Sequence, residues 1–358
     1  MGRAPARCHN ARRGAGFAAP RRLDCTVPAG ATAPFMFLVT GGAGFIGSNL
    51  VGALCARGDE VLVCDRLRDG GKWRNIAPFN IAGLLHPDDI GRWLDSAPRL
   101  DGVFHMGAIS ATTVRDGDLV AANNLNLTLA LWDWCAKRRV PLVYASSAAT
   151  YGDGAAGFDD DMAPEALARL RPLNLYGWSK HATDRRIVDL CRRHRAAPPR
   201  WAGLKFFNVY GPREAHKDRM ASVVLHKYRQ ILAGERATRF ASDTPGIADG
   251  GQRRDFVHVD DLVAAMLWLM EPGRPSGLFN LGTGTARSFA DLAGAVYAAL
   301  GLPPAIEYVA MPADLRGKYQ NFTEARMDRL RDAGFDRQPT PLEAGVARYV
   351  AWLRENDA

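Results

Sequence analysis

Long apolar runs are absent from this 358-residue sequence. No uninterrupted apolar run approaches the ~18 residues that a membrane-spanning helix needs, so we expect no membrane segment. The six cysteines form no CxxC pair, which argues against a zinc site and against a disulfide framework. We therefore expect reduced thiols, no metal and a cytoplasmic location.

Acidic residues are scarce in the first 35 positions, where six arginines and one aspartate give a net charge of +5. The whole chain carries +8, so the remainder carries +3, spread without a basic stripe. This distribution argues against nucleic acid as a partner and is compatible with an anionic small molecule. Residues 1–35 also lack apolar periodicity, so we expect a disordered tail, either a transit peptide or residues that precede a true start at Met36.

Short apolar runs alternate with helical segments from Phe35 onward. The runs lie at 35–40, 60–65, 102–108, 141–147, 204–211 and 277–284. Short apolar strands separated by helices indicate a parallel sheet that is covered on both faces. The alternation loosens after about residue 212, which indicates a smaller region interleaved with the sheet.

A glycine-rich turn, TGGAGFIGSNL, follows the first predicted strand and opens a helix. Glycines in this context allow a tight turn and bring backbone N–H groups close to a pyrophosphate at the helix N-terminus. Asp65 ends the next strand 18 residues after Gly47, near the ~20 expected for a ribose ligand. The glycines are Gly41, Gly42, Gly44 and Gly47. A dinucleotide is therefore predicted to bind at this turn.

These features together predict an α/β fold with a Rossmann-type doubly wound parallel sheet and a smaller interleaved substrate-binding region. The predicted dinucleotide-binding domain spans 36–211. The remainder, 212–358, is predicted to be mainly the substrate-binding region, with 252–284 returning to the sheet domain.

The residues around Asp65 leave the choice between NAD and NADP open. A carboxylate that accepts a hydrogen bond from the ribose 2′-OH favours NAD. Arg66, Arg68 and Lys72 follow at once, and a cationic cluster suits the 2′-phosphate of NADP unless these are solvated loop charges. We favour NADP.

Tyr176 and Lys180 lie four residues apart in NLYGWSKHA, where a helix is predicted to begin. The spacing places both side chains on one face, although a phenol packed beside a solvated lysine would give the same pattern. Next to a nicotinamide, the lysine cation and the positive ring would lower the pKa of the phenol. Tyr176 could then take a proton from a substrate hydroxyl as hydride leaves carbon. Ser147, at the end of the strand in YASSAATYG, is the candidate to hold that hydroxyl.

TGGAGFIG, SSAATYG and YGWSK together resemble the extended short-chain dehydrogenase/reductase superfamily, and the resemblance extends from Met36 to the C-terminus. It implies the oxidation, epimerisation or dehydration of a nucleotide-sugar. Ala148 and Ala149 occupy the positions where dehydratases of the superfamily have an Asp-Glu pair, which disfavours dehydration. The alternatives are then an epimerase and a reductase.

Four further segments narrow the resemblance: GAISATT (107–113), NVYGPREAHKDRMAS (208–222), QRRDFVHVDD (252–261) and GKYQNF (317–322). They are similar to the family of ADP-L-glycero-D-manno-heptose 6-epimerases, which make the heptose precursor of the lipopolysaccharide core. The resemblance implies that C6 of an ADP-heptose is oxidised to a ketone and then reduced from the opposite face. It also implies that a lysine matching Lys217 acts as a second base beside Tyr176. A homo-oligomer, with a pentamer as one candidate, is implied as well.

Matching positions in that family imply the remaining site residues. The cofactor contacts are Gly41, Gly44, Phe45, Ile46, Gly47, Asp65, Arg66, Lys72, Met106, Gly107, Ala108, Ile109, Ser110, Asn123, Lys180 and Val209. The substrate contacts are Asn208, Lys217, Arg219, His226, Phe240, Ala241, Ser242, Asp243, Arg254 and Tyr319. Arg254 suits a bidentate grip on the ADP pyrophosphate.

Plainer alternatives stay open for some of these residues. Lys217 could be a surface lysine, His226 an ordinary helix histidine, Asn208 a strand-end cap and Tyr319 a core aromatic.

The sequence also departs from the family pattern. Arg219 replaces a small serine, Met106 replaces a common glutamate, and the segment 244–251 is longer than the family's loop. Another nucleotide-sugar epimerase or reductase, such as a UDP-hexose 4-epimerase, is one alternative function, and the lysine of REAHK argues against it. A non-catalytic nucleotide sensor on the same fold is another, and the Tyr176–Lys180 pair argues against that.

Overall fold

The computed structural model describes residues 34–68, 70–96, 98–242, 246, 248–310 and 321–356. The predicted tail therefore lies almost entirely outside the described residues, as do Asp243 and Tyr319. Side chains are not described for Arg239 and Phe240.

A seven-stranded sheet forms the centre of the fold, and its strand pairings are all parallel. The strand order is β10-β6-β5-β4-β1-β2-β3. The strands are β1 (Met36–Thr40), β2 (Glu60–Cys64), β3 (Gly83–Leu85), β4 (Gly102–His105), β5 (Leu142–Ser147), β6 (Trp201–Phe206) and β10 (Gly277–Leu281). The chain moves in one direction from β1 to β2 and β3, and in the other to β4, β5 and β6. This order confirms the predicted Rossmann-type doubly wound sheet, in which ligands bind outside the carboxyl ends of the strands.

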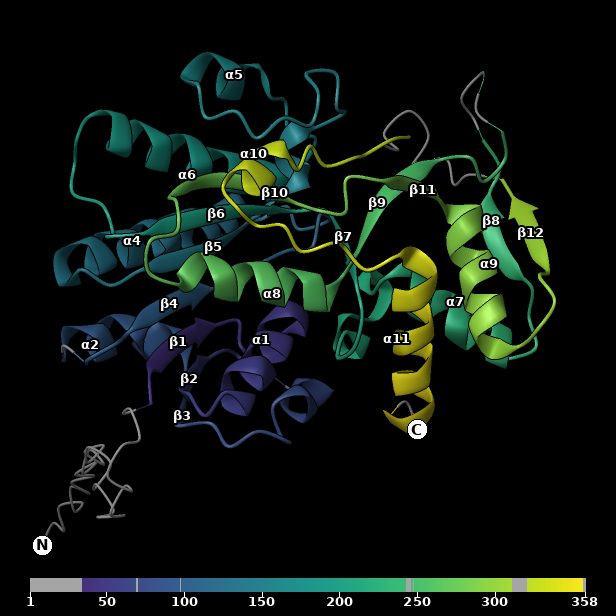
Figure 1. The fold of residues 1–358 in the computed structure, drawn as a ribbon, viewed down its shortest axis with the longest axis horizontal. Helices are drawn as coiled ribbons and strands as arrows, with labels where there is room; N and C mark the ends of the chain where they lie inside the picture. The colour runs from purple at the N-terminus through teal and green to yellow at the C-terminus, as the bar shows by residue number, and fades with distance from the viewer. Residues whose placement is uncertain are drawn as a thin grey trace, which may run out of the picture. The chain divides into compact units, whose positions relative to one another are not determined.

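Helices cover both faces of this sheet (Figure 1). Helices α1 (Phe45–Ala56) and α8 (Val259–Met270) pack against each other, and α4 (Leu127–Arg138) packs against α6 (Leu175–Arg192). Every residue of β5 and β6 is buried, as expected for central strands between two helical layers. Short helices α2 (Ile90–Asp95), α3 (Gly117–Val120), α5 (Pro164–Arg169) and α10 (Asp328–Asp332) complete this part.

A second apolar core lies in the C-terminal half, around α7 (Val223–Leu232), α9 (Phe289–Leu300) and α11 (Leu342–Asn356). Two small sheets flank it. One has the order β11-β9-β7, made of β11 (Ala286–Ser288), β9 (Arg253–His258) and β7 (Asn208–Tyr210); the other pairs β8 (Ala237–Phe240) with β12 (Ile306–Val309). Helix α9 begins with a capping box between Ser288 and Asp291, and Gly301 ends it at φ +74°, because a left-handed residue there is accessible to glycine without steric cost.

Four cysteines, Cys55, Cys64, Cys135 and Cys191, are free thiols in the described part of the chain. Within the same residues, no helix is long and apolar enough to cross a membrane, and no group of three or more His, Cys, Asp or Glu side chains could hold a metal ion.

Candidate active site

The glycine-rich turn between β1 and α1 is built as a close backbone cradle. Gly41 has φ +66°, and a Cβ there would lie 2.6 Å from the backbone nitrogen of Gly107. A Cβ on Gly47 would overlap the carbonyl oxygen of Gly41. Gly44, the N-cap of α1, has no side chain to occupy the first-turn N–H groups, so those of Phe45 and Ile46 are offered to an anion. The predicted dinucleotide cradle therefore fits a pyrophosphate.

Asp65 closes the turn at the end of β2. Its Oδ2 accepts from the backbone N–H of Ala43 at 2.9 Å, and its Oδ1 accepts from Lys72 Nζ at 2.5 Å. Arg66 instead turns to Asp88, with Nη2 2.5 Å from Oδ1. The predicted cationic cluster is thus divided, because Lys72 lies at the cradle while Arg66 has a carboxylate partner that the sequence did not indicate.

The segment Met106–Ser110 runs beside the glycine turn. Gly107 N–H donates to Thr40 Oγ1 at 3.1 Å, and that hydroxyl also lies 2.6 Å from His105 Nδ1. The other ring nitrogen of His105 is 2.9 Å from Thr128 Oγ1. Burial lowers the pKa of His105 to about 3, so the ring is neutral and its two hydrogen bonds fix one tautomer.

Asn124, which the sequence reasoning missed, holds the same segment from the other side. Its Oδ1 accepts from Ile109 N–H at 2.8 Å, and its Nδ2 donates to Ile109 O and to Ser179 Oγ, each at 3.0 Å. Ser179 Oγ in turn donates to the carbonyl of Tyr176 at 2.7 Å. The neighbouring Asn123, the predicted contact, donates to Leu119 O in its own helix. Both amides belong to the π-helical turn Ala121–Asn126, and the Asn-Asn pair was the only signal of Asn124 in the sequence.

Tyr176 lies in the first turn of α6, beside Ser147. Asn174 caps the helix by accepting from Gly177 N–H at 2.9 Å. Gly177 also lets α6 approach the 3₁₀ turn Ala148–Tyr151, since a Cβ there would lie 2.7 Å from Ala149 O. The phenol of Tyr176 is half-buried, and Ser147 lies near enough to lower its pKa. The structure thus brings together the predicted base and the predicted hydroxyl-holding serine.

Lys180 lies one turn further along α6 and is 2% exposed. Its Nζ donates to the carbonyl of Ala145 at 2.6 Å. Burial lowers the pKa of Lys180 to about 8, and Asp184 opposes that shift. Lys180 is therefore less basic than a solvated lysine, and the carboxylate of Asp184 favours its protonated form.

The pKa of Tyr176 differs from the expectation. In the polypeptide itself, burial raises the pKa of the phenol; the hydrogen bond with Ser147 acts in the opposite direction, and Asp184 raises the pKa further. The spacing of Tyr176 and Lys180 indicates only the charge of the lysine, whereas desolvation and the carboxylate of Asp184 also act on the phenol.

Lys217 belongs to the loop PREAHK (212–217), which is attached to the dinucleotide cradle. Asn49 on α1 donates to Pro212 O at 2.9 Å and accepts from Arg213 at 2.8 Å. Asn75 Nδ2 donates to Ala43 O at 3.0 Å and lies 3.0 Å from His216 Nδ1.

The side chain of Lys217 is half-buried, with Nζ 5.4 Å from the centre of the Phe45 ring. Burial lowers the pKa of Lys217, and Glu214 opposes the shift. Lys217 is therefore a partly desolvated amine at the start of α1, and not a fully solvated surface lysine.

The predicted substrate contacts are more dispersed. Asn208 and Arg254 lie on the adjacent strands β7 and β9; Asn208 is exposed, whereas Arg254 is 6% exposed with its guanidinium 5.6 Å from the Phe289 ring centre. Arg219 and His226 are exposed. Ala241 and Ser242 are half-buried, and Ser242 N–H donates to Asp249 at 2.7 Å.

A doubly wound sheet, a glycine cradle after β1 and a serine–tyrosine–lysine group beside β5 define a nicotinamide-dependent enzyme of the short-chain dehydrogenase/reductase type. Residues 37–282 match the model of the NAD dependent epimerase/dehydratase family. The chain belongs to this family, and its cofactor is a nicotinamide dinucleotide.

Two curated relatives match nearly the whole described chain. The ADP-L-glycero-D-manno-heptose-6-epimerase of Fusobacterium nucleatum is 43% identical over 334 residues, which cover 90% of this chain and 99% of the relative. The protein of the same name from Nitratidesulfovibrio vulgaris is 46% identical over 319 residues, covering 88% and 97%.

Solved structures show the same fold. The ADP-L-glycero-D-manno-heptose-6-epimerase of Helicobacter pylori superposes with a TM-score of 0.73 at 28% identity, covering 90% of this chain and 96% of that one. The UDP-glucose 4-epimerase of Thermus thermophilus, solved in complex with NAD, has a TM-score of 0.71 at 28% identity, covering 90% and 100%.

Proposed function

We propose that this protein converts ADP-D-glycero-D-manno-heptose to ADP-L-glycero-D-manno-heptose by transient oxidation at C6. The observation that supports this most directly is the attachment of the PREAHK loop to the glycine cradle, which holds the partly desolvated Lys217 amine beside Phe45 at the start of α1. Relatives that cover almost the whole chain have this activity in their names.

The described residues have distinct roles in this reaction. Ser147 holds the C6 hydroxyl, and Tyr176 removes its proton as the C6–H bond breaks. The bound nicotinamide supplies the acceptor, and later the donor, of the hydride. Lys180 stabilises the phenolate by its charge. After the ketone has turned, Lys217 donates a proton to the C6 oxygen as hydride returns to C6. A second proton-transfer group is needed because the two epimers present this oxygen in different directions.

NADP is the proposed form of the cofactor. A 2′-phosphate beside an unpaired Asp65 would be repelled, but this carboxylate accepts from Ala43 N–H and from Lys72. Arg66 is within the same loop and is only partly exposed. Lys72 therefore offsets the charge of Asp65, and Arg66 would exchange Asp88 for the 2′-phosphate. The homo-oligomer, the cytoplasmic location and the division at residues 211 and 212 stay predictions.

A direct test denatures the purified protein, identifies the released nucleotide, and then follows ADP-heptose epimers by NMR with UDP-glucose as the comparison substrate. We expect NADP in the released fraction and equilibration of the two C6 epimers. Turnover of UDP-glucose without turnover of ADP-heptose would favour a UDP-hexose 4-epimerase instead.

A further inference from the structure

A third polar residue continues the Tyr176–Lys180 face of α6. Asp184 lies one turn beyond Lys180 and is fully buried. Its Oδ1 accepts from Tyr144 Oη at 3.0 Å, and its Oδ2 accepts from Ser146 Oγ at 2.6 Å. A buried carboxylate therefore lies on the same helix face as the proposed base and its lysine.

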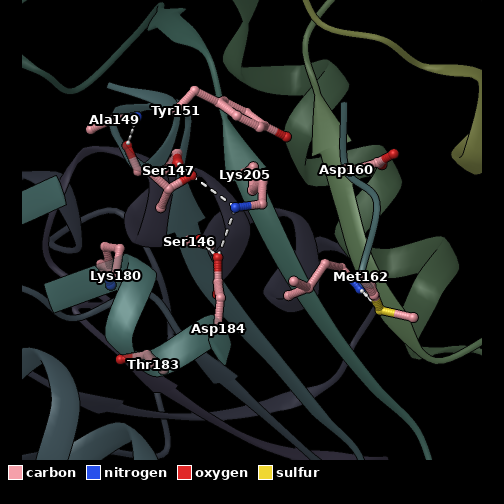
Figure 2. A network of polar contacts seen from close by, with 12 residues as sticks. Ser146, Ser147, Ala149, Tyr151, Asp160, Met162, Lys180, Thr183, Asp184 and Lys205 are labelled. Carbon is pink, nitrogen blue, oxygen red and sulfur yellow. Dashed lines mark hydrogen bonds and ion pairs between the residues drawn. The ribbon is translucent and has the colours of Figure 1, made fainter. Parts of the chain in front are cut away.

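Lys205 on β6 is the cationic partner of this carboxylate. Its side chain is fully buried, with Nζ 2.9 Å from Asp184 Oδ2 and 2.8 Å from Thr150 Oγ1. Figure 2 shows Lys205 between Ser147, at the end of β5, and the carboxylate of Asp184, with Lys180 on the neighbouring turn of α6. Thr150 Oγ1 donates to the carbonyl of Ser147 at 2.8 Å. Lys205 is thus linked through Thr150 to the backbone of Ser147, and through Asp184 to the helix that contains Tyr176 and Lys180.

An unpaired Asp184 would oppose the chemistry of this site. A carboxylate in a buried environment attracts the ammonium group of Lys180 and repels a phenolate at Tyr176. The pKa of Tyr176 and the pKa of Lys180 are both raised by Asp184. A cation that neutralises Asp184 would leave the charge of Lys180 available to the phenolate.

We propose that Lys205 is a positioning residue of the active site. By pairing with Asp184 it leaves the charge of Lys180 for Tyr176, and through Thr150 it fixes the turn that presents Ser147. This inference rests on the proposed role of Tyr176 as the base. It assigns a function to a buried ion pair that could otherwise be regarded as core packing.

Other titratable groups face this cluster from the surrounding elements. They are His105 on β4, Tyr144 on β5, Tyr151 in the 3₁₀ turn, His181, Arg185 and Cys191 on α6, and Asp160 and Arg171 in neighbouring loops. Burial lowers the pKa of His105 to about 3 and of His181 to about 4. Burial also raises the pKa of Tyr144 and of Tyr151 well above the ordinary value. These four groups stay neutral near pH 7, so they do not account for a titration there.

The test is an ultraviolet difference titration of the phenolate in the holoenzyme, with each variant measured against its own Tyr176→Phe counterpart. Lys205→Met should raise the apparent pKa of Tyr176 by about one unit or more, since Asp184 is then uncompensated. Lys205→Met combined with Asp184→Asn should return it to within about half a unit of the unsubstituted protein. Lys205→Arg, which keeps the charge, is the matched control and should not shift it.

An unchanged phenol pKa in Lys205→Met, accompanied only by a lower melting temperature, would overturn the proposal in favour of a packing role. If Lys205→Met does not fold, Asp184→Asn provides the second measurement, and it should lower the phenol pKa. No change there would overturn the proposal equally. The titration needs no sugar substrate, so failure to turn over ADP-heptose would count against the proposed function without altering this result.

Discussion

Gly177 on α6 lies against the carbonyl of Ala149, so closely that a Cβ would be 2.7 Å from that oxygen. This contact packs the start of the helix with Tyr176 against the turn that follows Ser147. The missing side chain at position 177 is therefore a requirement of the active site, because a methyl group would push the two elements apart.

Gly177→Ala should lower the epimerisation rate by about 10²-fold, since a displacement of about 1 Å between reacting groups has effects of this size. The rate is measured by NMR on the ADP-heptose epimers. Gly294→Ala is the matched control: it is a glycine of α9 with nothing within 4 Å of its Cβ position, and it should keep the rate while stabilising the fold by up to about 1 kcal/mol. Equal rates in both variants would contradict the proposed requirement.

Tyr176→Phe and Lys217→Met should each reduce epimerisation by about 10²–10⁴-fold if each residue serves one orientation of the C6 hydroxyl. Each single variant should retain hydride transfer to a keto substrate in one geometry, which absorbance of the reduced nicotinamide would report. Lys180→Ala is the comparison, because it should weaken cofactor binding as well. A Lys217→Met rate within about threefold of the unsubstituted enzyme, far below the acid–base range, would remove Lys217 from the chemistry.

Neutralising Arg66 and Lys72 together should weaken the binding of NADP much more than that of NAD. We expect a loss of at least about tenfold in NADP affinity, from two charge-assisted contacts to the 2′-phosphate. Titration calorimetry of both nucleotides measures the difference. Lys137→Ala, an exposed lysine in the last turn of α4, is the control. Equal affinities of the unsubstituted protein for NAD and NADP would contradict the cofactor assignment.

His105 should make the fold sensitive to acid. Its pKa is about 3 in the folded protein because of burial, against ~6.5 in an unfolded chain. Below about pH 6.5 the unfolded chain binds a proton that the folded protein does not, so the stability present above that pH is lost as the pH falls toward about 3. His181 and His216, whose pKa values are about 4 through burial, act in the same direction.

His105→Gln should therefore lose less stability than the unsubstituted protein between about pH 7 and about pH 5. Urea denaturation at the two pH values measures the difference in the free energy of unfolding. His86→Gln changes an exposed histidine and should leave the loss unaltered. The same acid-induced loss in His105→Gln as in the unsubstituted protein would show that His105 does not contribute.

The sequence by itself determined the features that depend on neighbouring residues. A glycine turn after an apolar strand, and a tyrosine four residues before a lysine on a helix, are local patterns that chain geometry converts directly into a cradle and a shared face. The alternation of strands and helices was enough to predict the doubly wound sheet, because parallel strands need helical crossovers.

Only the tertiary structure decided which distant groups meet. Asp184 and Lys205 lie 21 positions apart in the chain, and no spacing rule joins a helix residue to a strand residue at that separation. Packing of separate segments likewise decides that Lys72 pairs with Asp65 while Arg66 pairs with Asp88. It also decides that Asn124, and not Asn123, binds the backbone of Ile109. The pKa of Tyr176 is raised first by burial and then by Asp184, and no local sequence pattern measures either effect.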